Sequence, residues 1–166
     1  MSDLLEKVRD DLQSVIQPSG TTILIEGPMP IVWADRARLR QVWTNLLTNA
    51  IKYVKPGTAP RIVLRCKEEK THFLFEMQDN GIGIAPEFHE RIFKLFHRLH
   101  LSGTYTGTGV GLAIVKRVVE FHRGKIWMES VVGQGSTFCF TIPRSADSQK
   151  NPVPMAIVAA QPSQGA

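Results

Sequence analysis

Hydrophobic and polar residues alternate with two different periods along the first third of the chain. Apolar residues recur every three or four positions over 3–16, with charged residues between them, which predicts a helix that the following Pro-Ser-Gly ends. Residues 21–26 alternate at strand spacing. Asp35 is then a plausible N-cap for a second helix, which is expected to end before the Lys-Pro-Gly turn at 55–57. The apolar side of this helix is predicted to consist of Leu39, Val42, Trp43, Leu46, Leu47, Ala50 and Ile51.

The rest of the chain also alternates between strand and helix patterns. Residues 61–67 and 71–78 predict two strands, and the charged Glu-Glu-Lys between them favours a β-hairpin. A third main helix is expected over 110–122, followed by strands over 125–130 and 136–142. This order of elements predicts an α+β two-layer sandwich. Three main helices would pack on one face of a mixed sheet of about five strands, and the other face would be partly solvated.

Three segments follow neither period. Residues 79–88 contain Gly and Pro and predict a loop, and the polar, Gly-rich residues 98–109 predict a mobile one. Between them, 87–97 are expected to be helical. The apolar side of that short helix comprises Phe88, Ile92, Phe93 and Phe96. From 144 to 166 there is no period and there are three prolines, which favours a disordered tail or linker after a domain that occupies 1–143.

The composition is that of an ordinary globular domain, since 43% of the 166 residues are hydrophobic and 21% are charged. The net charge of +5 comes from scattered Lys and Arg residues without a basic run, so no nucleic-acid partner is expected. Cys66 and Cys139 lie in strand-like segments without metal-binding spacing, which predicts reduced thiols in a cytoplasmic protein. No apolar run approaches the roughly 18 to 20 residues that span a bilayer, and the acidic N-terminus is unlike a signal peptide.

Three polar residues share one side of the second predicted helix. Asn45 and Asn49 are four residues apart and Lys52 follows three later, so the helical repeat brings them together. An amide oxygen is a hard ligand suited to Mg²⁺, and a lysine suits a phosphate. Taken alone, the pattern is more often a polar stripe on an exposed helix face.

Asp79 is expected at the end of a strand, shortly before Gly81 and Gly83. Glycine at these positions lets the backbone turn sharply and approach a flat ligand closely. A carboxylate there could accept a hydrogen bond from the adenine amino group, whereas guanine presents a carbonyl that Asp79 would repel. Such a charged hydrogen bond contributes about 1.5–3 kcal/mol. An ordinary Asp-Asn-Gly turn is the plainer interpretation of the motif alone.

A second glycine-rich motif, Gly-Thr-Gly-Val-Gly-Leu at 107–112, leads into the third main helix. Exposed N–H groups at a helix start, together with the helix dipole, favour a phosphate. The spacing is neither that of the dinucleotide fingerprint nor that of the Walker loop, and a flexible hinge is an equally good interpretation. Two weaker candidates lie nearby in the sequence. Arg98 could reach the terminal phosphate when the loop closes, and Thr137 could support adenine directly or through water.

Together and in this order, the motifs resemble the N, G1, F, G2 and G3 boxes of the histidine kinase catalytic domain, in the ATPase superfamily shared with gyrase and MutL. The resemblance covers about residues 3–143 and includes the stretches ADRARLRQVWTNLLTNAIKY, FKLFHRLH, GVGLAIVKRVVEFHRGKIWMES and GSTFCFTIP. Within these, FHRLH and GKIWMES are similar to phytochrome-like kinases. The resemblance implies a Bergerat-type ATP-binding fold.

ATP and Mg²⁺ are the cofactors that this resemblance implies, with ATP between the second helix and the loop over 98–110. Asn49 would hold the metal, Lys52 would touch a phosphate and Asp79 would read adenine. The residues with implied catalytic roles are Asn45, Asn49, Lys52 and Arg98. The implied nucleotide contacts are Asn49, Lys52, Tyr53, Asp79, Gly81, Ile82, Gly83, Phe96, Gly107, Thr108, Gly109, Val110, Gly111, Leu112 and Thr137.

A whole histidine kinase also carries a phosphoacceptor histidine, followed by an acidic residue, on a dimerisation helix. None of the five histidines has that setting, and each is interpreted as a surface or lid residue: His72, His89, His97, His100 and His122. The resemblance therefore implies a domain that donates the γ-phosphoryl group of Mg-ATP to a histidine on a separate dimerisation domain, and acts indirectly on a response regulator. Alone, it would be a monomer that is not competent for autophosphorylation.

Functions besides histidine phosphorylation remain open on the sequence alone. Relatives that hydrolyse ATP activate water with a glutamate one helical turn before the magnesium-binding asparagine, where this chain has Asn45. An amide cannot take a proton from water near neutral pH, which favours a kinase over an ATPase. The motifs are also compatible with an ATP-binding module without transfer activity and with a serine-directed kinase.

Overall fold

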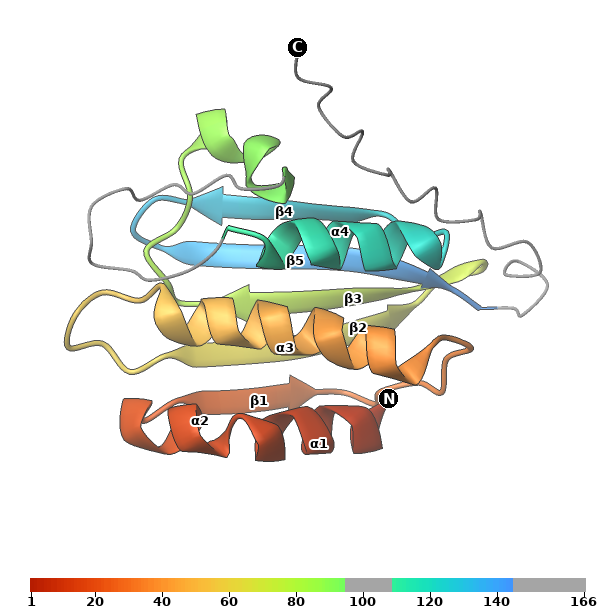
Figure 1. Ribbon diagram of the computed structural model, residues 1–166, viewed down its shortest axis with the longest axis horizontal. Coiled ribbons are helices and arrows are strands. Elements are labelled where there is room, and N and C mark those ends of the chain that lie inside the picture. Colours follow the sequence, from red (N-terminus) through yellow and green to blue (C-terminus); the bar gives the residue numbers. More distant parts are fainter. Residues whose placement is uncertain (95–108, 145–166) are drawn as a thin grey trace, which may run out of the picture.

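The computed structural model describes residues 1–94 and 109–144 (Figure 1). In these ranges the elements are α1 (Ser2–Asp11), α2 (Gln13–Ser19), β1 (Thr22–Glu26), α3 (Arg36–Lys52), β2 (Arg61–Glu68), β3 (His72–Asp79), the 3₁₀ helices η1 (Pro86–Phe88) and η2 (Arg91–Phe93), α4 (Gly111–Phe121), β4 (Ile126–Val131) and β5 (Gly135–Pro143). The strands agree with the predicted segments to within one or two residues at each end.

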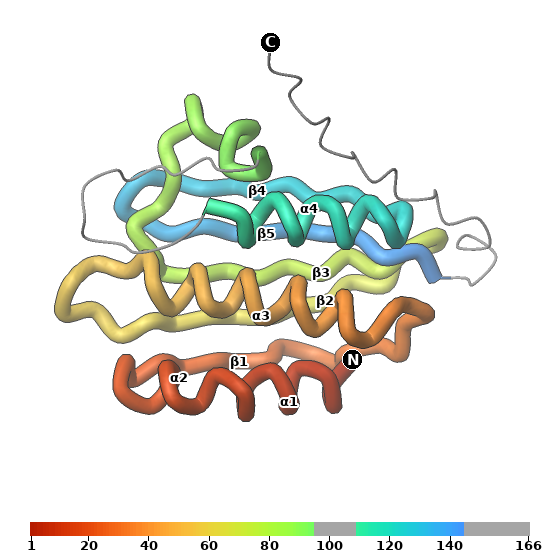
Figure 2. Tube along the Cα trace, viewed as in Figure 1, coloured from red at the N-terminus to blue at the C-terminus, as the bar shows by residue number. Residues whose placement is uncertain are grey.

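The strands form one mixed sheet in the order β1-β2-β3-β5-β4. β1 pairs with β2 in parallel, and the other neighbouring strands are antiparallel. The helices lie on one face of this sheet, where α3 and α4 run side by side (Figure 1 and Figure 2). Every second residue of β3, from Phe73 to Asp79, is buried, while the residues between them face the more exposed side. The predicted α+β sandwich with one partly solvated face is therefore confirmed.

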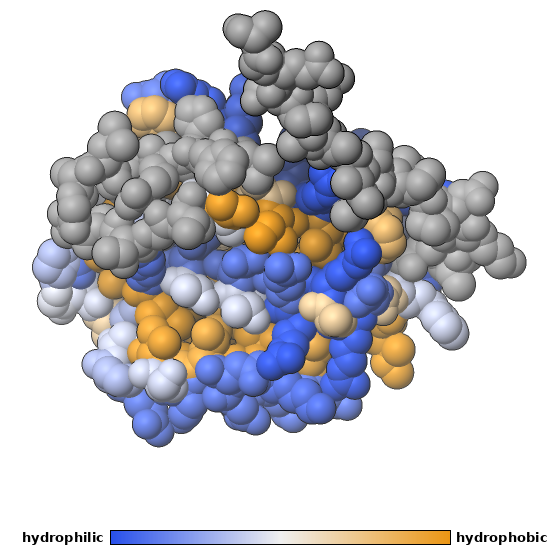
Figure 3. Space-filling view, viewed as in Figure 1, coloured by the Kyte–Doolittle hydropathy of each residue, from blue (hydrophilic) through white to orange (hydrophobic). Residues whose placement is uncertain are grey.

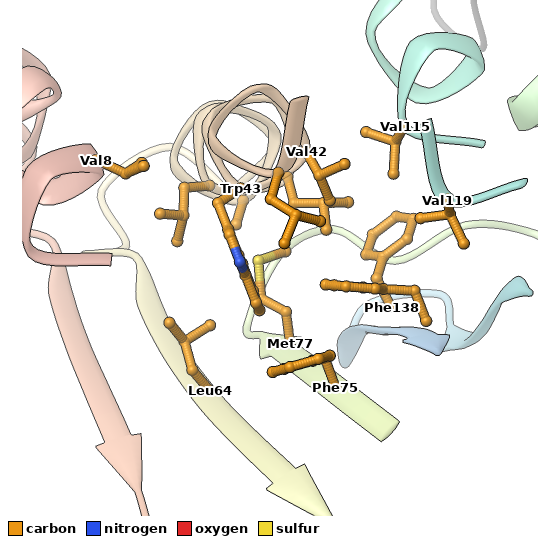
Figure 4. Packing of buried hydrophobic residues seen from close by; sticks show 14 of the residues in the cluster. Val8, Val42, Trp43, Leu64, Phe75, Met77, Val115, Val119 and Phe138 are labelled. Carbon is orange, nitrogen blue, oxygen red and sulfur yellow. The ribbon is translucent and has the colours of Figure 1, made fainter. Parts of the chain in front are cut away.

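Helix α3 begins and packs as its sequence predicts. The Asp35 carboxylate accepts a hydrogen bond from the backbone N–H of Arg38 at 3.0 Å and so caps the helix. All seven predicted apolar residues are buried. Trp43 is fully buried among them and lies close to Phe75 (Figure 4). Its ring meets those of Phe75 and Phe140 edge-on at centroid distances of 5.9 and 5.2 Å. The centre of the core thus lies between α3 and the middle of the sheet.

The prediction for the first helix is wrong in its continuity and in its end. The chain forms two helices, which meet at Leu12, where ψ of 4° leaves the helical range. Pro18 lies inside α2, where it removes one intrahelical hydrogen bond near the end but does not stop the helix. Ser19 reinforces this last turn, because its hydroxyl donates to the carbonyl of Val15 at 2.7 Å. Gly20, at φ +64°, then ends the helix in the left-handed conformation.

The single helix predicted over 87–97 is also wrong within the described residues. Two separate 3₁₀ turns, η1 and η2, form instead, and Lys94 is already extended at φ −84° and ψ 146°. Single turns have little stability of their own, so packing decides their geometry. Ile92 is buried and Phe88 and Phe93 pack against the core, which confirms the predicted apolar side for these three residues.

Two segments, 95–108 and 145–166, lie outside the described ranges, and most of the predicted loop and tail falls there. Arg144, the first residue of the predicted tail, is held by the β2–β3 hairpin. Its N–H donates to the carbonyl of Thr71 at 3.0 Å, and its guanidinium pairs with Glu68 at 2.7 Å. No helix in the described part of the chain combines the length and apolar character needed to cross a membrane.

The two cysteines are free thiols, as predicted. Cys66 is half-buried opposite Phe75 on the helix-covered side of the sheet, whereas Cys139 is buried on the other side, opposite Glu76. Burial is the largest cause that raises the pKa of each thiol to about 11, and nearby carboxylates add to it. Both thiols are therefore protonated near neutral pH, which makes them poor nucleophiles.

Candidate functional site

The carboxyl-terminal half of α3 carries the first group of predicted site residues. Asn45 and Asn49 lie one turn apart, both half-buried, and Lys52 is the last residue of the helix. The Lys52 ammonium nitrogen lies 4.9 Å from the ring centre of Tyr53, which is the C-cap residue. The helix thus presents two amides, an ammonium group and an aromatic ring along two successive turns.

Asp79 ends β3 and is almost completely buried, with 8% of its surface exposed. Its Oδ1 atom accepts the backbone N–H of Gly81 at 2.8 Å and that of Ser136 at 3.2 Å. Burial raises the pKa of the Asp79 carboxyl, and these two hydrogen bonds offset the rise only in part. Because both bonds end on Oδ1, Oδ2 is the oxygen that could accept a hydrogen bond from a ligand.

The glycine loop that follows β3 lies against the end of α3. The N–H of Ile82 donates to the carbonyl of Tyr53 at 2.9 Å. A Cβ on Gly81 would lie 2.6 Å from the same carbonyl oxygen, and a Cβ on Gly83, where φ is +70°, would strike the carbonyl of Val131. Only glycine fits these two close approaches. The loop therefore brings the Asp79 carboxylate beside the end of the helix that carries the asparagines.

The start of α4 reaches the same part of α3. A Cβ on Gly111, the first residue of α4, would lie 3.2 Å from Oδ1 of Asn45. The amide nitrogen of Asn45 is buried without a hydrogen-bond partner among the described residues. Val110 is the N-cap and provides no side-chain cap, so the N–H groups that open α4 suit an anion. Gly109 precedes them with φ of +70°, and Leu112, the second residue of α4, is partly buried against the hydrophobic core. Hydrophobic residues also lie at the surface over the first half of α4 (Figure 3).

Some predicted site residues are not part of this arrangement. Four of them lie outside the described residues, and their roles stay predictions: Phe96, Arg98, Gly107 and Thr108. Thr137 pairs with Gln78 in the β3–β5 register, so both side chains lie on the sheet face opposite to Asp79. The structure therefore does not bring Thr137 to the carboxylate.

Ser136 is the residue that the sequence interpretation missed. It is buried, its N–H donates to Asp79, and its hydroxyl lies 2.9 Å from the hydroxyl of Ser130. Phe138, two residues later, is a buried core residue. Because side chains alternate along a strand, placing Phe138 in the core would have placed Ser136, and not Thr137, on the Asp79 side.

A metal ion would meet few charged protein ligands here. Within 1–94 and 109–144, no three His, Cys, Asp or Glu side chains form a group that could hold a metal. Mg²⁺ commonly takes one or two protein oxygens and completes its shell with phosphates and waters. The single amide oxygen of Asn49 fits an ion that is bound mainly by a nucleotide.

His122 corrects the interpretation of the histidines as surface or lid residues. It is 1% exposed at the end of α4. Its Nε2 accepts the backbone N–H of Asp35 at 3.0 Å, so the ring proton is on Nδ1 and donates to the carbonyl of Val118 at 2.8 Å. This ring joins the end of α4 to the cap of α3, and it has no acidic neighbour of the kind that follows a phosphoacceptor.

A buried carboxylate beside a glycine loop, next to an asparagine-bearing helix on a five-stranded mixed sheet, defines a class of ATP-binding domains. The chain belongs to the family described as histidine kinase-, DNA gyrase B- and HSP90-like ATPases, whose model matches residues 34–146. It is 45% identical over 143 residues to the phytochrome-like protein Cph1 of Synechocystis sp., an alignment that covers 86% of this chain and 19% of Cph1. The chain thus spans about a fifth of that relative.

Solved structures agree with this assignment. The nucleotide-free catalytic domain of the histidine kinase ThkA matches with a TM-score of 0.75 and 29% identity, over 89% of this chain and 95% of that domain. ThkA in complex with the response regulator protein TrrA matches with a TM-score of 0.71 and 27% identity, over 91% of this chain and 42% of that chain. The fold is therefore that of a histidine kinase catalytic domain.

Proposed function

We propose that this domain binds Mg-ATP and donates the γ-phosphoryl group to a histidine on a separate phosphoacceptor domain. The observation that carries the proposal is that the glycine loop beside the buried Asp79 carboxylate contacts the end of α3, while the start of α4 contacts Asn45 on the same helix. Membership of the histidine kinase family supports ATP binding and a role in two-component signalling.

Asp79 selects the base in this proposal. Its free oxygen, Oδ2, accepts a hydrogen bond from the adenine amino group. Guanine presents a carbonyl oxygen at the same position, so two acceptors would face each other in a buried site. A hydrogen bond to a charged group contributes about 1.5–3 kcal/mol, and leaving the Oδ2 atom of the buried carboxylate without a donor costs a similar amount.

The triphosphate would extend from the end of α3 to the start of α4. Lys52 and the N–H groups that open α4 offset its negative charge. The amide nitrogen of Asn45 has no partner within 1–94 and 109–144, and it is a donor that a phosphate oxygen would satisfy. Asn49 would hold Mg²⁺, which would supply positive charge to offset that of the phosphates. Arg98 is proposed to approach the terminal phosphate.

The nucleophile comes from the partner. An imidazole nitrogen attacks the γ-phosphorus, the bond from that phosphorus to the β–γ bridging oxygen breaks, and ADP leaves with the electron pair. The imidazole releases its proton to solvent. Phosphoryl transfer depends mainly on positioning and charge neutralisation, which the described residues supply. Asn45 cannot deprotonate water near neutral pH, which favours transfer over hydrolysis.

The proposed partner is the dimerisation domain of a histidine kinase, with a response regulator acting after it. The match to ThkA, whose solved complex contains a response regulator protein, supports this order. We expect the chain alone to be a cytoplasmic monomer that cannot autophosphorylate, and to act on the partner's histidine.

Transfer is tested by incubating the chain with a purified dimerisation domain of a related kinase and γ-radiolabelled Mg-ATP. Label on the partner that is stable in base and lost in acid supports the proposal. Label that survives acid indicates a serine kinase instead. ATP binding in a separate titration without any label indicates a binding module that does not transfer phosphate. Asp79→Asn is the control, and it should abolish both binding and labelling.

A further inference from the structure

The hydroxyl of Ser130, in β4, joins segments that surround the Asp79 carboxylate. It accepts the backbone N–H of Ile84 at 2.8 Å and donates to the carbonyl of Gly135 at 2.8 Å. It also lies 2.9 Å from the hydroxyl of Ser136. Because its one proton points to Gly135, the Ser136 hydroxyl donates in this third bond. The single donor and both acceptor positions of the Ser130 hydroxyl are therefore used.

One arm of this network reaches the carboxylate through Ser136. The N–H of Ser136 donates to Oδ1 of Asp79 at 3.2 Å, beside the N–H of Gly81 at 2.8 Å. A Cβ on Gly135 would strike the backbone carbonyl of Asp79, so the start of β5 and the end of β3 are in direct contact. Ser136 and Asp79 are 6% and 8% exposed, so water has little access to replace a lost bond.

The other arm reaches the glycine loop through Ile84. A second bond ties the same two segments together, because the N–H of Gly133 donates to the carbonyl of Ile82 at 2.7 Å. Gly83 lies directly against the carbonyl of Val131, with no room for a side chain. Ser130 thereby fixes the spacing between the β4–β5 turn and the glycine loop. This loop holds the carboxylate of Asp79 from the side opposite to Ser136.

We propose that Ser130 is a positioning residue for base recognition, because its hydroxyl holds the Asp79 carboxylate in the orientation that presents Oδ2 to the base. The proposal rests on the proposed function, in which Asp79 reads adenine. Ser130 acts through Ser136 and Ile84. Without its hydroxyl, the N–H of Ile84 and the hydroxyl of Ser136 lose their acceptor, and the carboxylate is no longer held from both sides. Adenine binding weakens most, since guanine makes no favourable contact with the carboxylate.

The test is a calorimetric titration of the chain and of Ser130→Ala with ATP and with GTP, in the presence of Mg²⁺. The Kd for ATP should rise about tenfold or more in Ser130→Ala, which is the effect expected from the lost hydrogen bonds. The Kd for GTP should change by less than about twofold, so the preference for ATP over GTP falls. Circular dichroism checks that each variant is folded at the titration temperature.

A second variant keeps the test decisive if Ser130→Ala does not fold. Ser130→Cys keeps the shape of the side chain, but its sulfur is a weaker donor and acceptor. It should lower the preference for ATP in the same direction and by a smaller factor. Ser136→Ala keeps the backbone N–H that binds Asp79, and it too should have a smaller effect than Ser130→Ala.

Ser19→Ala is the matched control. The Ser19 hydroxyl also has three hydrogen-bonding partners, but at the end of α2: its one proton is shared between the carbonyls of Val15 and Ile16, and the hydroxyl of Thr21 donates to it. This variant should leave the preference for ATP unchanged. A folded Ser130 variant that keeps the wild-type preference, or that loses ATP and GTP affinity in parallel, overturns the proposal. A wild-type chain that shows no preference for ATP overturns the proposed function instead.

Discussion

The Asp79 carboxylate opposes the stability of the fold that holds it. Burial raises its pKa, and the hydrogen bonds from Gly81 and Ser136 offset only part of this effect. When the pKa of a carboxyl group is higher in the folded state than in the unfolded state, its ionisation favours unfolding. The stability of the fold is therefore lost as the pH rises through the folded-state pKa. The buried negative charge of Asp79 is therefore better explained by ligand binding than by a contribution to the stability of the fold.

Asp79→Asn is accordingly expected to raise the Tm of the nucleotide-free protein near neutral pH. The amide keeps an oxygen for both N–H donors and buries no charge. Below the pKa of the unfolded carboxyl, the wild-type group is protonated in both states, so the difference in Tm should disappear. It should grow as the pH rises through the folded-state pKa of Asp79.

Differential scanning calorimetry from about pH 3, which is below the ordinary carboxyl pKa, to about pH 8 measures this difference. ATP should raise the Tm of the wild type and leave that of Asp79→Asn unchanged. A variant that is less stable than the wild type across the whole range would show that the charge supports the fold, which is the opposite of this expectation.

Motifs located the residues that are proposed to contact a ligand better than the residues that hold them in place. Asp79, Asn49 and the glycines stand out because few physical roles need those residue types in that order. Ser130 ends the family-like stretch GKIWMES, but no physical argument from the sequence gives it a role, since a serine in a strand is usually an exposed residue. Its role depends on the contact between β4 and the glycine loop, which are far apart in the sequence.

For the helices, the length over which the apolar pattern repeats determined how well the element could be predicted. The apolar stripe of α3 repeats over 17 residues, and every predicted core residue is buried. The stripe of the first helix also continues through Leu12, so the break between α1 and α2 leaves no trace in the pattern. The segment that became η1 and η2 has an apolar side that fits either one helix or two separate turns.

His122 links α4 to α3 at the end far from the asparagines, and its removal is expected to loosen this pair of helices. His122→Ala leaves the part-buried N–H of Asp35 without its partner, and the carbonyl of Val118 keeps only the bond from the backbone N–H of residue 122. The free energy of unfolding should fall by about 1–3 kcal/mol, which is the usual cost of unsatisfied buried groups. Urea denaturation followed by circular dichroism measures it.

His72→Ala is the control for this measurement. The His72 ring is only half-buried and has a bond to the neighbouring hydroxyl of Thr71. Its replacement should change the free energy of unfolding by no more than about 0.5 kcal/mol. Equal losses in the two variants would mean that the buried link through His122 contributes nothing specific.

For the whole molecule, the fold class followed from the order of elements, but the arrangement of the strands did not. Parallel pairing of β1 with β2 joins Thr22 to Arg61, and β5 lies between β3 and β4. Such pairings depend on contacts between distant segments, which a local pattern does not contain. Local patterns do not predict the candidate site for the same reason, because it is formed by α3, the glycine loop and α4, which are distant in the sequence.

Trp43 is expected to be a main contributor to the stability of the whole domain, because it is fully buried between α3 and the sheet. Trp43→Ala should lower the free energy of unfolding by about 3–5 kcal/mol through lost apolar contact and an unfilled cavity. Ile31→Ala, at a residue that is 90% exposed, should change it by less than about 0.5 kcal/mol. Chemical denaturation compares them, and a Trp43→Ala variant as stable as Ile31→Ala would contradict the central place of the indole in the core.

The parallel strand β1 also sets an order of assembly. The β2–β3 hairpin closes through a short turn. The connection between β1 and β2 contains the whole of α3, so the pairing of these two strands has a larger entropic cost. β1 is also at the edge of the sheet, with a single neighbouring strand. It is therefore expected to join last as the chain folds and to exchange its amide protons with solvent before the central strands β2, β3 and β5, and Asp79 lies at the end of β3 within that protected group.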